Sequence, residues 1–232
     1  MTAESGVAVT GDIAPTIRTV PFPRRLAVAG LVLGAAGNTA EAIIGQLIGD
    51  RPDTVAERMQ MAAEKTAVIG TMMTIGTVAV PFMAIGFLAA AHLLRRRARR
   101  TATVAAVLLL AGMWGFVGVH VLELLNLAAL NAPDPVAIGT FLDSLESDPW
   151  LLALFGVPFM AGAVLGMLTL TIGMLVTGAV PRWIPTTWLA FIVLDFSIGA
   201  VGPVNPHWLY LVGAVGLAVH IARRGNRAWA NA

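Results

Sequence analysis

Long apolar runs, repeated along almost the whole chain, constrain this sequence more than any other feature. The runs cover residues 26–48, 67–94, 102–130, 150–178, 184–201 and 208–222. About 20 apolar residues in a helix match a hydrocarbon layer of roughly 30 Å, so each run predicts a membrane-spanning helix, although the last two are short. We therefore expect an all-α protein, a polytopic transmembrane bundle of about six helices.

The composition agrees with this class and argues against others. Of the 232 residues, 57% are hydrophobic, 12% are charged and none is cysteine, which excludes disulfides and thiolate metal sites. A net charge of +2 with a pI near 9.9 does not indicate nucleic-acid binding, because the basic residues fall at the ends of the spans instead of on a soluble face.

Basic residues also predict the orientation. If six spans alternate, twelve of the fifteen Lys and Arg residues share one side, namely Arg18, Arg24, Arg25, Arg95, Arg96, Arg97, Arg99, Arg100, Arg182, Arg223, Arg224 and Arg227. Cytoplasmic segments are enriched in Lys and Arg, so both termini are expected in the cytoplasm and the protein in the inner (cytoplasmic) membrane. Segment 131–149, on the opposite side, contains four acids and no basic residue and is expected to be a loop.

The expected domain organisation is simple. Residues 1–24 predict a flexible cytoplasmic tail because they contain three prolines and no sustained hydrophobic period. Residues 25–224 form the single transmembrane helical domain, and residues 225–232 a short cytoplasmic tail.

Two local patterns predict a helix start and packing surfaces. Thr54 followed by Glu57 fits a capping box, so the helix of the second span is expected to begin outside the membrane within residues 54–68. Small residues spaced for close helix packing are Gly30 with Gly34, Gly162 with Gly166, and Gly112 with Gly115 and Gly118.

Three acids lie inside the expected spans: Glu41, Glu123 and Asp195. Each costs about 2.5 to 3.5 kcal/mol in the bilayer centre, so each should face the bundle interior or water. Each also lies seven or eight residues before the expected outer end of its span, or roughly 10 to 12 Å deep at 1.5 Å per residue.

Further polar residues are expected near the same depth as the three acids. Asn38 shares a helix face with Glu41, and His120, Glu123 and Asn126 recur at a spacing of three residues. The sequence therefore predicts one outward-facing polar pocket between the first, third and fifth spans. Its ligand-binding residues are Asn38, Glu41, His120, Glu123, Asn126 and Asp195. His207 falls in an expected outer turn and is not included.

Three roles remain open for this pocket. It could bind or move a small or lipidic molecule with proton coupling, the acids being protonatable and His120 a relay. It could also be a membrane-embedded acid–base enzyme acting on an apolar terpenoid or lipid-like substrate, with Glu41, Glu123, Asp195 and His120 as catalytic candidates. In the third role the polar residues only lock helix packing, as in a structural or assembly protein.

No metal or cofactor is expected. His120 and Glu123 could ligate one ion with Glu41 and Asp195, but the His-x-x-Glu order occurs once, whereas di-metal bundles use Glu-x-x-His twice. The chain also has no nucleotide-binding or hydrolase motif. The expected partners are the lipid bilayer and a small-molecule or lipidic ligand, and no protein partner is indicated.

Two resemblances add to these expectations. The segment GAVLGMLTLTIGMLVTGAVPRWIP, residues 162–185, resembles uncharacterised small multi-pass bacterial membrane proteins in which a glycine-rich helix ends in a Pro-Arg-Trp-like turn. This resemblance implies a six-helix membrane protein and no particular activity. The chain is also similar to small polytopic terpene cyclases in size and in its intramembrane acids, which implies the enzyme role.

Overall fold

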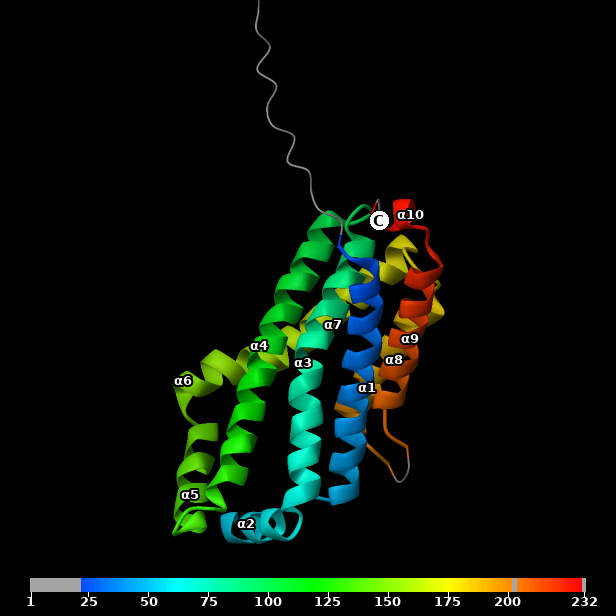
Figure 1. The fold of residues 1–232 in the computed structure, drawn as a ribbon. Helices are drawn as coiled ribbons and strands as arrows, with labels where there is room; N and C mark the ends of the chain where they lie inside the picture. The colour runs from blue at the N-terminus through cyan, green and yellow to red at the C-terminus, as the bar shows by residue number, and fades with distance from the viewer. Residues whose placement is uncertain (1–21, 202–203, 231–232) are drawn as a thin grey trace, which may run out of the picture.

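The computed structural model describes residues 22–201 and 204–230, and most of the expected amino-terminal tail lies outside this part of the chain. The described residues form a bundle of α-helices without a β-sheet, so the expected all-α bundle is confirmed (Figure 1). The long elements are α1 (Arg24–Ile48), α3 (Thr66–Leu94), α4 (Arg99–Ala129), a continuous helix from Pro149 to Thr177 that ends as α7 (Ala163–Thr177), α8 (Trp183–Ser197) and α9 (His207–Arg223).

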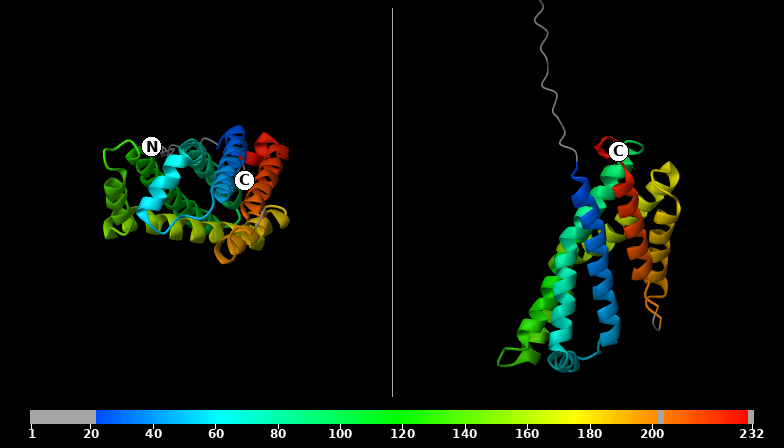
Figure 2. Two further views of the ribbon diagram at one scale, coloured as in Figure 1. Left: turned by 90° about the horizontal axis from the view of Figure 1, so that it is seen from below. Right: turned by 45° about the vertical axis from the view of Figure 1, so that its right-hand side comes forward.

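The helix from Pro149 to Thr177 begins as the short α6 (Pro149–Leu151) and continues through two wide π-helical turns, η1 (Leu152–Gly156) and η2 (Pro158–Gly162). A proline inside a helix lacks an N–H donor, and Pro158 stands where the second wide turn begins. This helix crosses the bundle obliquely against α4, as the two views in Figure 2 show.

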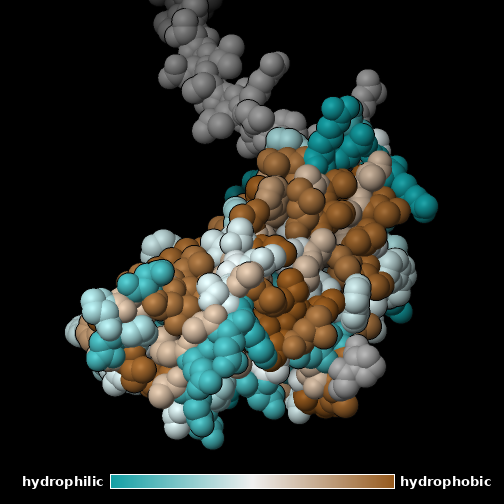
Figure 3. All heavy atoms as spheres, turned by 60° about the horizontal axis from the view of Figure 1, so that its bottom comes forward, coloured by the Kyte–Doolittle hydropathy of each residue, from teal (hydrophilic) through white to brown (hydrophobic). Residues whose placement is uncertain are grey.

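Four of these helices are long and apolar enough to cross a membrane: α1, α3, α4 and the helix from Pro149 to Thr177. α8 is apolar but only 15 residues long. Large apolar side chains are exposed on the sides of the bundle, such as Val107 (62% exposed) and Val176 (81%). Figure 3 shows hydrophobic residues on the sides and hydrophilic residues toward the two ends.

Two short helices lie at one end of the bundle, which we call the α2 end: α2 (Val55–Glu64) lies across it, and α5 (Pro135–Glu146) stands beside the end of α4 (Figure 1). The expected cap of α2 is confirmed, because the Thr54 side chain accepts a hydrogen bond from the Glu57 N–H. However, α2 is a helix of its own, separated from α3 at Lys65 and lying across the bundle end in Figure 1, rather than the first turns of the second span.

The expected loop at 131–149 is also wrong in part, since α5 occupies most of it. Asp134 caps α5 by accepting from the Ala137 N–H, with Pro135 in the first turn. Asp148 caps α6 in the same way by accepting from the N–H groups of Trp150 and Leu151. These caps explain why an acidic, polar segment forms helix here.

The opposite end of the bundle, which we call the arginine end, carries most of the arginines. Here Arg97 donates to the carbonyl oxygens of Thr177 and Gly178 at the end of α7, and Arg224 donates to the Ala179 oxygen. The short helix α10 (Asn226–Ala230) buries Trp229 in the same region. Arginines at helix carboxyl ends also complement the helix dipole.

Glycines bring the helices into close contact, as their spacing predicts. A Cβ atom at Gly34 would lie 2.5 Å from the Met83 nitrogen of α3, and one at Gly112 would lie 2.6 Å from the Ala163 nitrogen of α7. Since real Cβ atoms are not found this close, only glycine permits these crossings. The α4 glycines therefore face the oblique helix, which leaves another side of α4 for His120 and Glu123.

Candidate functional site

Glu41 on α1 and His120 on α4 form a buried pair. Glu41 Oε1 lies 2.8 Å from His120 Nε2, and the two side chains are 14% and 2% exposed. His120 Nδ1 lies 2.9 Å from the carbonyl oxygen of Phe116, one turn earlier on α4. Because a carbonyl oxygen only accepts, Nδ1 carries a hydrogen, and Nε2 is then an acceptor unless the imidazole is doubly protonated.

It follows that the contact between Glu41 and His120 holds one proton. Either Glu41 is a carboxylic acid that donates to Nε2, or His120 is an imidazolium that donates to the carboxylate. The two forms differ only in which atom of this 2.8 Å hydrogen bond carries the hydrogen. The other oxygen, Glu41 Oε2, is buried and accepts no hydrogen bond from the residues that the structure describes.

Gly76 of α3 makes room for this pair. A Cβ atom at Gly76 would overlap the carboxyl group of Glu41, so a glycine is required at this point of α3. The Glu41 carboxyl is thus enclosed by three helices: its own α1, α3 at Gly76 and α4 at His120. The sequence offers Gly76 as one of many glycines and gives no sign of this role.

Asp195 of α8 belongs to a second cluster. Its Oδ1 lies 3.5 Å from Nδ1 of His207, the first residue of α9. Asn205 holds His207 in place, since its Oδ1 lies 3.0 Å from His207 Nδ1 and accepts from the His207 backbone N–H. Thr39 of α1 donates to the His207 carbonyl oxygen over 3.1 Å, which ties this cluster to the helix of Glu41.

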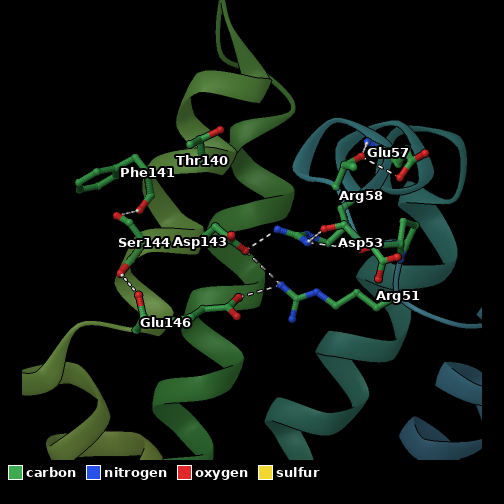
Figure 4. A network of polar contacts seen from close by, with 12 residues as sticks. Arg51, Asp53, Glu57, Arg58, Thr140, Phe141, Asp143, Ser144 and Glu146 are labelled. Atoms are coloured by element: carbon green, nitrogen blue, oxygen red, sulfur yellow. Dashed lines mark hydrogen bonds and ion pairs between the residues drawn. The ribbon is translucent and has the colours of Figure 1, made fainter.

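Glu123 instead lies beside a charged network at the α2 end. Figure 4 shows the four residues of this network, Arg51, Arg58, Asp143 and Glu146. Arg51, in the α1–α2 connection, lies 3.8 Å from Glu123 and 2.8 Å from Glu146 of α5. Arg58 of α2 pairs with Asp143 of α5. The hydrogen bond to Glu146, with the nearby acids, raises the pKa of the Arg51 guanidinium, so Arg51 remains charged at any physiological pH.

A cavity of about 340 Å³, which we call the vestibule, opens beside this network. Its lining is mainly apolar and includes four methionines. The lining residues are Gly45, Ile48, Gly49, Arg51, Val55, Arg58, Met59, Met61, Ala62, Ile69, Met72, Met73, Val119, Glu123, Asn126, Leu127, Gly139 and Asp143. The vestibule therefore joins an apolar, adaptable floor to a rim that carries both positive and negative charges.

A second cavity of about 150 Å³, which we call the inner cavity, lies deeper between the long helices. Most of its lining is aromatic or aliphatic, with three polar side chains, Asn38, Asp195 and His207. The remaining lining residues are Met83, Phe87, Leu109, Met113, Phe116, Phe159, Ala163, Val164, Met167, Phe191, Ile192, Phe196 and Tyr210.

Along their helices, Glu41 and His120 lie between residues that line the two cavities. On α4, Phe116 lines the inner cavity and Glu123 lines the vestibule, and His120 lies between them. On α1, Asn38 lines the inner cavity and Gly45 the vestibule, with Glu41 between. The proton-sharing contact thus falls, along both helices, between residues of the charged vestibule and residues of the aromatic inner cavity.

The residues expected to form one pocket are therefore distributed over three places. Glu41 and His120 meet directly, Glu123 and Asn126 line the vestibule, and Asn38 and Asp195 line the inner cavity. Each acid has its own basic neighbour, namely His120 for Glu41, Arg51 for Glu123 and His207 for Asp195.

Sequence reasoning missed Arg51, Arg58 and His207. The two arginines lie on the side with few basic residues, and an isolated positive charge opposite an acidic segment is a usable signal for pairing. His207 directly precedes an apolar run, so it is expected at the first residue of a helix, where its side chain can reach the end of the bundle. Within the described residues, no group of three His, Asp or Glu side chains gathers closely enough to hold a metal ion.

Four helices of membrane-spanning length, apolar sides and polar groups enclosed within the bundle indicate a helical membrane protein. In comparisons with protein-family models, with curated proteins and with solved structures, the chain matches none of them. The resemblance of residues 162–185 to uncharacterised multi-pass proteins stays a prediction from the sequence.

Proposed function

We propose that this protein crosses the inner membrane six times, with both termini in the cytoplasm, and binds a small amphipathic or lipidic molecule in the vestibule from the outer side. Four spans are α1, α3, α4 and the helix from Pro149 to Thr177, and the shorter α8 and α9 pack together as the other two. The distribution of arginines supports this orientation, because the arginine end carries nearly all of them.

The vestibule is the observation that carries the proposed binding. Its volume of about 340 Å³ falls within the range of roughly 300 to 1,000 Å³ that is typical of small-molecule sites. Unbranched methionine side chains adapt to an apolar chain, as in proteins that accept several hydrophobic ligands. Arg51, Arg58, Glu123 and Asp143 place two cations and two anions at the rim, which suits a polar or zwitterionic head group.

The pair of Glu41 and His120 gives the vestibule a means of coupling to protons. Its single proton is enclosed by three helices and lies about one turn from the vestibule residues Gly45 and Glu123. A change in protonation changes the charge between α1 and α4, and buried groups of this kind are characteristic of proton-coupled membrane proteins. Movement of the bound molecule is thus expected to depend on Glu41 and His120, whereas binding depends on the vestibule lining.

Blocking the vestibule tests the proposal. The full chain is purified in maltoside, stripped of lipid and mixed with phosphatidylethanolamine, and bound lipid is counted by native mass spectrometry. Ala62→Trp, which projects into the vestibule, should remove the retained lipid, whereas Val107→Trp on the exposed side of α4 should retain it. Equal retention in both variants, with unchanged thermal stability, would contradict binding in the vestibule.

A membrane-embedded acid–base enzyme is the second candidate, and the inner cavity favours it. The Asp195 carboxylate among aromatic rings would stabilise positive charge on an apolar substrate. The pair of Glu41 and His120, which holds one proton, would act as the general acid. The cavity of about 150 Å³ admits only part of a terpenoid. This candidate requires new products from an added isoprenoid substrate in gas chromatography, and their loss in Asp195→Asn.

A further inference from the structure

Two groups of aromatic rings face the inner cavity from different helices. Phe116 of α4 stacks on Phe159 with ring centroids 4.8 Å apart and an interplanar angle of 12°. Phe191 of α8 lies 5.4 Å from Tyr210 of α9. All four residues line the cavity, which therefore presents aromatic surface on both the α4 side and the α8–α9 side.

Among the described residues that line the inner cavity, Asp195 is the only acid, and His207 is the only side chain that could carry a positive charge, since lysine and arginine are absent from them. His207 lies near Asp195, but its Nδ1 is 3.5 Å away, longer than the usual hydrogen bond of about 2.7 to 3.2 Å, and it is directed to Asn205 at 3.0 Å. His207 is thus a neighbour of Asp195 whose closer contact is with Asn205, and among the described residues the carboxylate has no closer partner, while 29% of its side chain is exposed.

A carboxylate and several aromatic rings that line one cavity are complementary to an organic cation. The negative face of an aromatic ring attracts a cation, and quaternary ammonium groups are recognised by such aromatic surroundings. The size of the cavity adds a limit. A volume of about 150 Å³ corresponds to about five water molecules at roughly 30 Å³ each, which is close to a trimethylammonium group with one methylene.

We infer that the inner cavity is a binding site for a small quaternary ammonium group, held by Asp195 and by the rings of Phe116, Phe159, Phe191 and Tyr210. Asp195 supplies the counter-charge and the rings replace the water of the cation. This site is separate from the vestibule and does not rest on the lipid binding proposed above, because its lining residues are different.

Choline and its uncharged isostere 3,3-dimethyl-1-butanol test the site directly. The two probes have the same shape and differ in charge, and their binding to the full chain in maltoside is followed by saturation-transfer NMR of the methyl protons. We expect choline to bind at least tenfold more tightly than the isostere. Equal affinity of the two probes, or no choline binding, would overturn the inference.

Matched variants separate charge, rings and folding. Asp195→Asn keeps the size of the side chain and should weaken choline binding at least tenfold without changing the affinity for the isostere. Phe191→Leu keeps an apolar side chain but removes a ring, and should weaken choline binding severalfold. Ala62→Trp in the vestibule should leave choline binding unchanged, so failure of lipid binding and failure of this site are distinguishable. Unaltered choline binding in Asp195→Asn would contradict the assignment.

Discussion

Glu41 Oε1 of α1 lies 2.8 Å from His120 Nε2 of α4, and the other imidazole nitrogen, Nδ1, donates a hydrogen bond to the Phe116 carbonyl oxygen. This geometry requires one proton between the two side chains. The pair links two helices that are distant in sequence and lies, along both of them, between residues of the vestibule and residues of the inner cavity. Both stability and any proton coupling are therefore expected to depend on it.

Removing one partner should cost far more than neutralising the other. His120→Leu leaves the Glu41 carboxyl enclosed without its partner, and we expect a loss of about 3 to 5 kcal/mol in unfolding free energy. Glu41→Gln keeps a hydrogen bond to Nε2 through its amide and should cost only about 1 kcal/mol. Denaturant unfolding in detergent measures both, with Glu64→Gln on the exposed face of α2 as control. Equal small losses would contradict a proton-sharing pair.

Gly76 provides a second test of the same pair. Gly76→Ala places a methyl group where the Glu41 carboxyl lies, so Glu41 must move away from His120, and we expect a loss of at least about 2 kcal/mol, as for overpacking in a core. Gly70→Ala lies on the same helix with open space around its Cβ, and should be neutral or stabilising by up to about 1 kcal/mol. Thermal melts of the two variants compare them. The same melting temperature for both would show that Gly76 does not shape the site.

The two arginines at the α2 end should differ in importance. Arg58 is 15% exposed and also donates to the Asp53 carbonyl oxygen, whereas the Arg51 side chain is 49% exposed. We expect Arg58→Gln to cost about 1 to 3 kcal/mol, and Arg51→Gln less than about 1 kcal/mol, decreasing further at high salt. Unfolding at low and high ionic strength measures the difference. A larger loss of unfolding free energy for Arg51→Gln than for Arg58→Gln would contradict this expectation.

The absence of cysteine makes the proposed orientation easy to measure. Single cysteines replace Ser147, beside α5, and Arg96, at the arginine end, and intact cells are treated with a membrane-impermeant maleimide. We expect labelling at 147 only, and labelling at 96 only after the cells are opened. Labelling at 96 in intact cells would place the arginine end outside.

Hydropathy predicted the long helices because each apolar run has few ways to satisfy its backbone in lipid except as a helix. Hydropathy failed at α5, where a polar composition concealed a helix that begins with a side-chain cap at Asp134. At α2 the cap at Thr54 was predicted, but the break that separates this helix from α3 at Lys65 was not. Whether these segments form separate helices depends on local hydrogen bonds and on packing against the bundle end, and hydropathy measures neither.

The site was harder to predict than the fold. Depth along a helix follows from counting residues, so the three acids could be placed at one level. The direction in which each acid points depends on how the helices cross. These crossings depend on close contacts, such as that of Gly34 in α1 with α3 and that of Gly112 in α4 with α7. For this reason Glu41 and His120 could be associated with one pocket, whereas the pairing of Glu123 with Arg51 and of Asp195 with His207 could not.

Photolabelling tests the central claim, that the vestibule binds an amphipathic molecule, most directly. A phosphatidylethanolamine with a diazirine in its acyl chain is bound to the full chain and irradiated, and the labelled peptides are mapped by mass spectrometry. We expect the labels to be concentrated on the methionines of the vestibule at 59, 61, 72 and 73 and to be lost in Ala62→Trp. Labels spread over exposed side positions such as Val107, unaffected by Ala62→Trp, would contradict it.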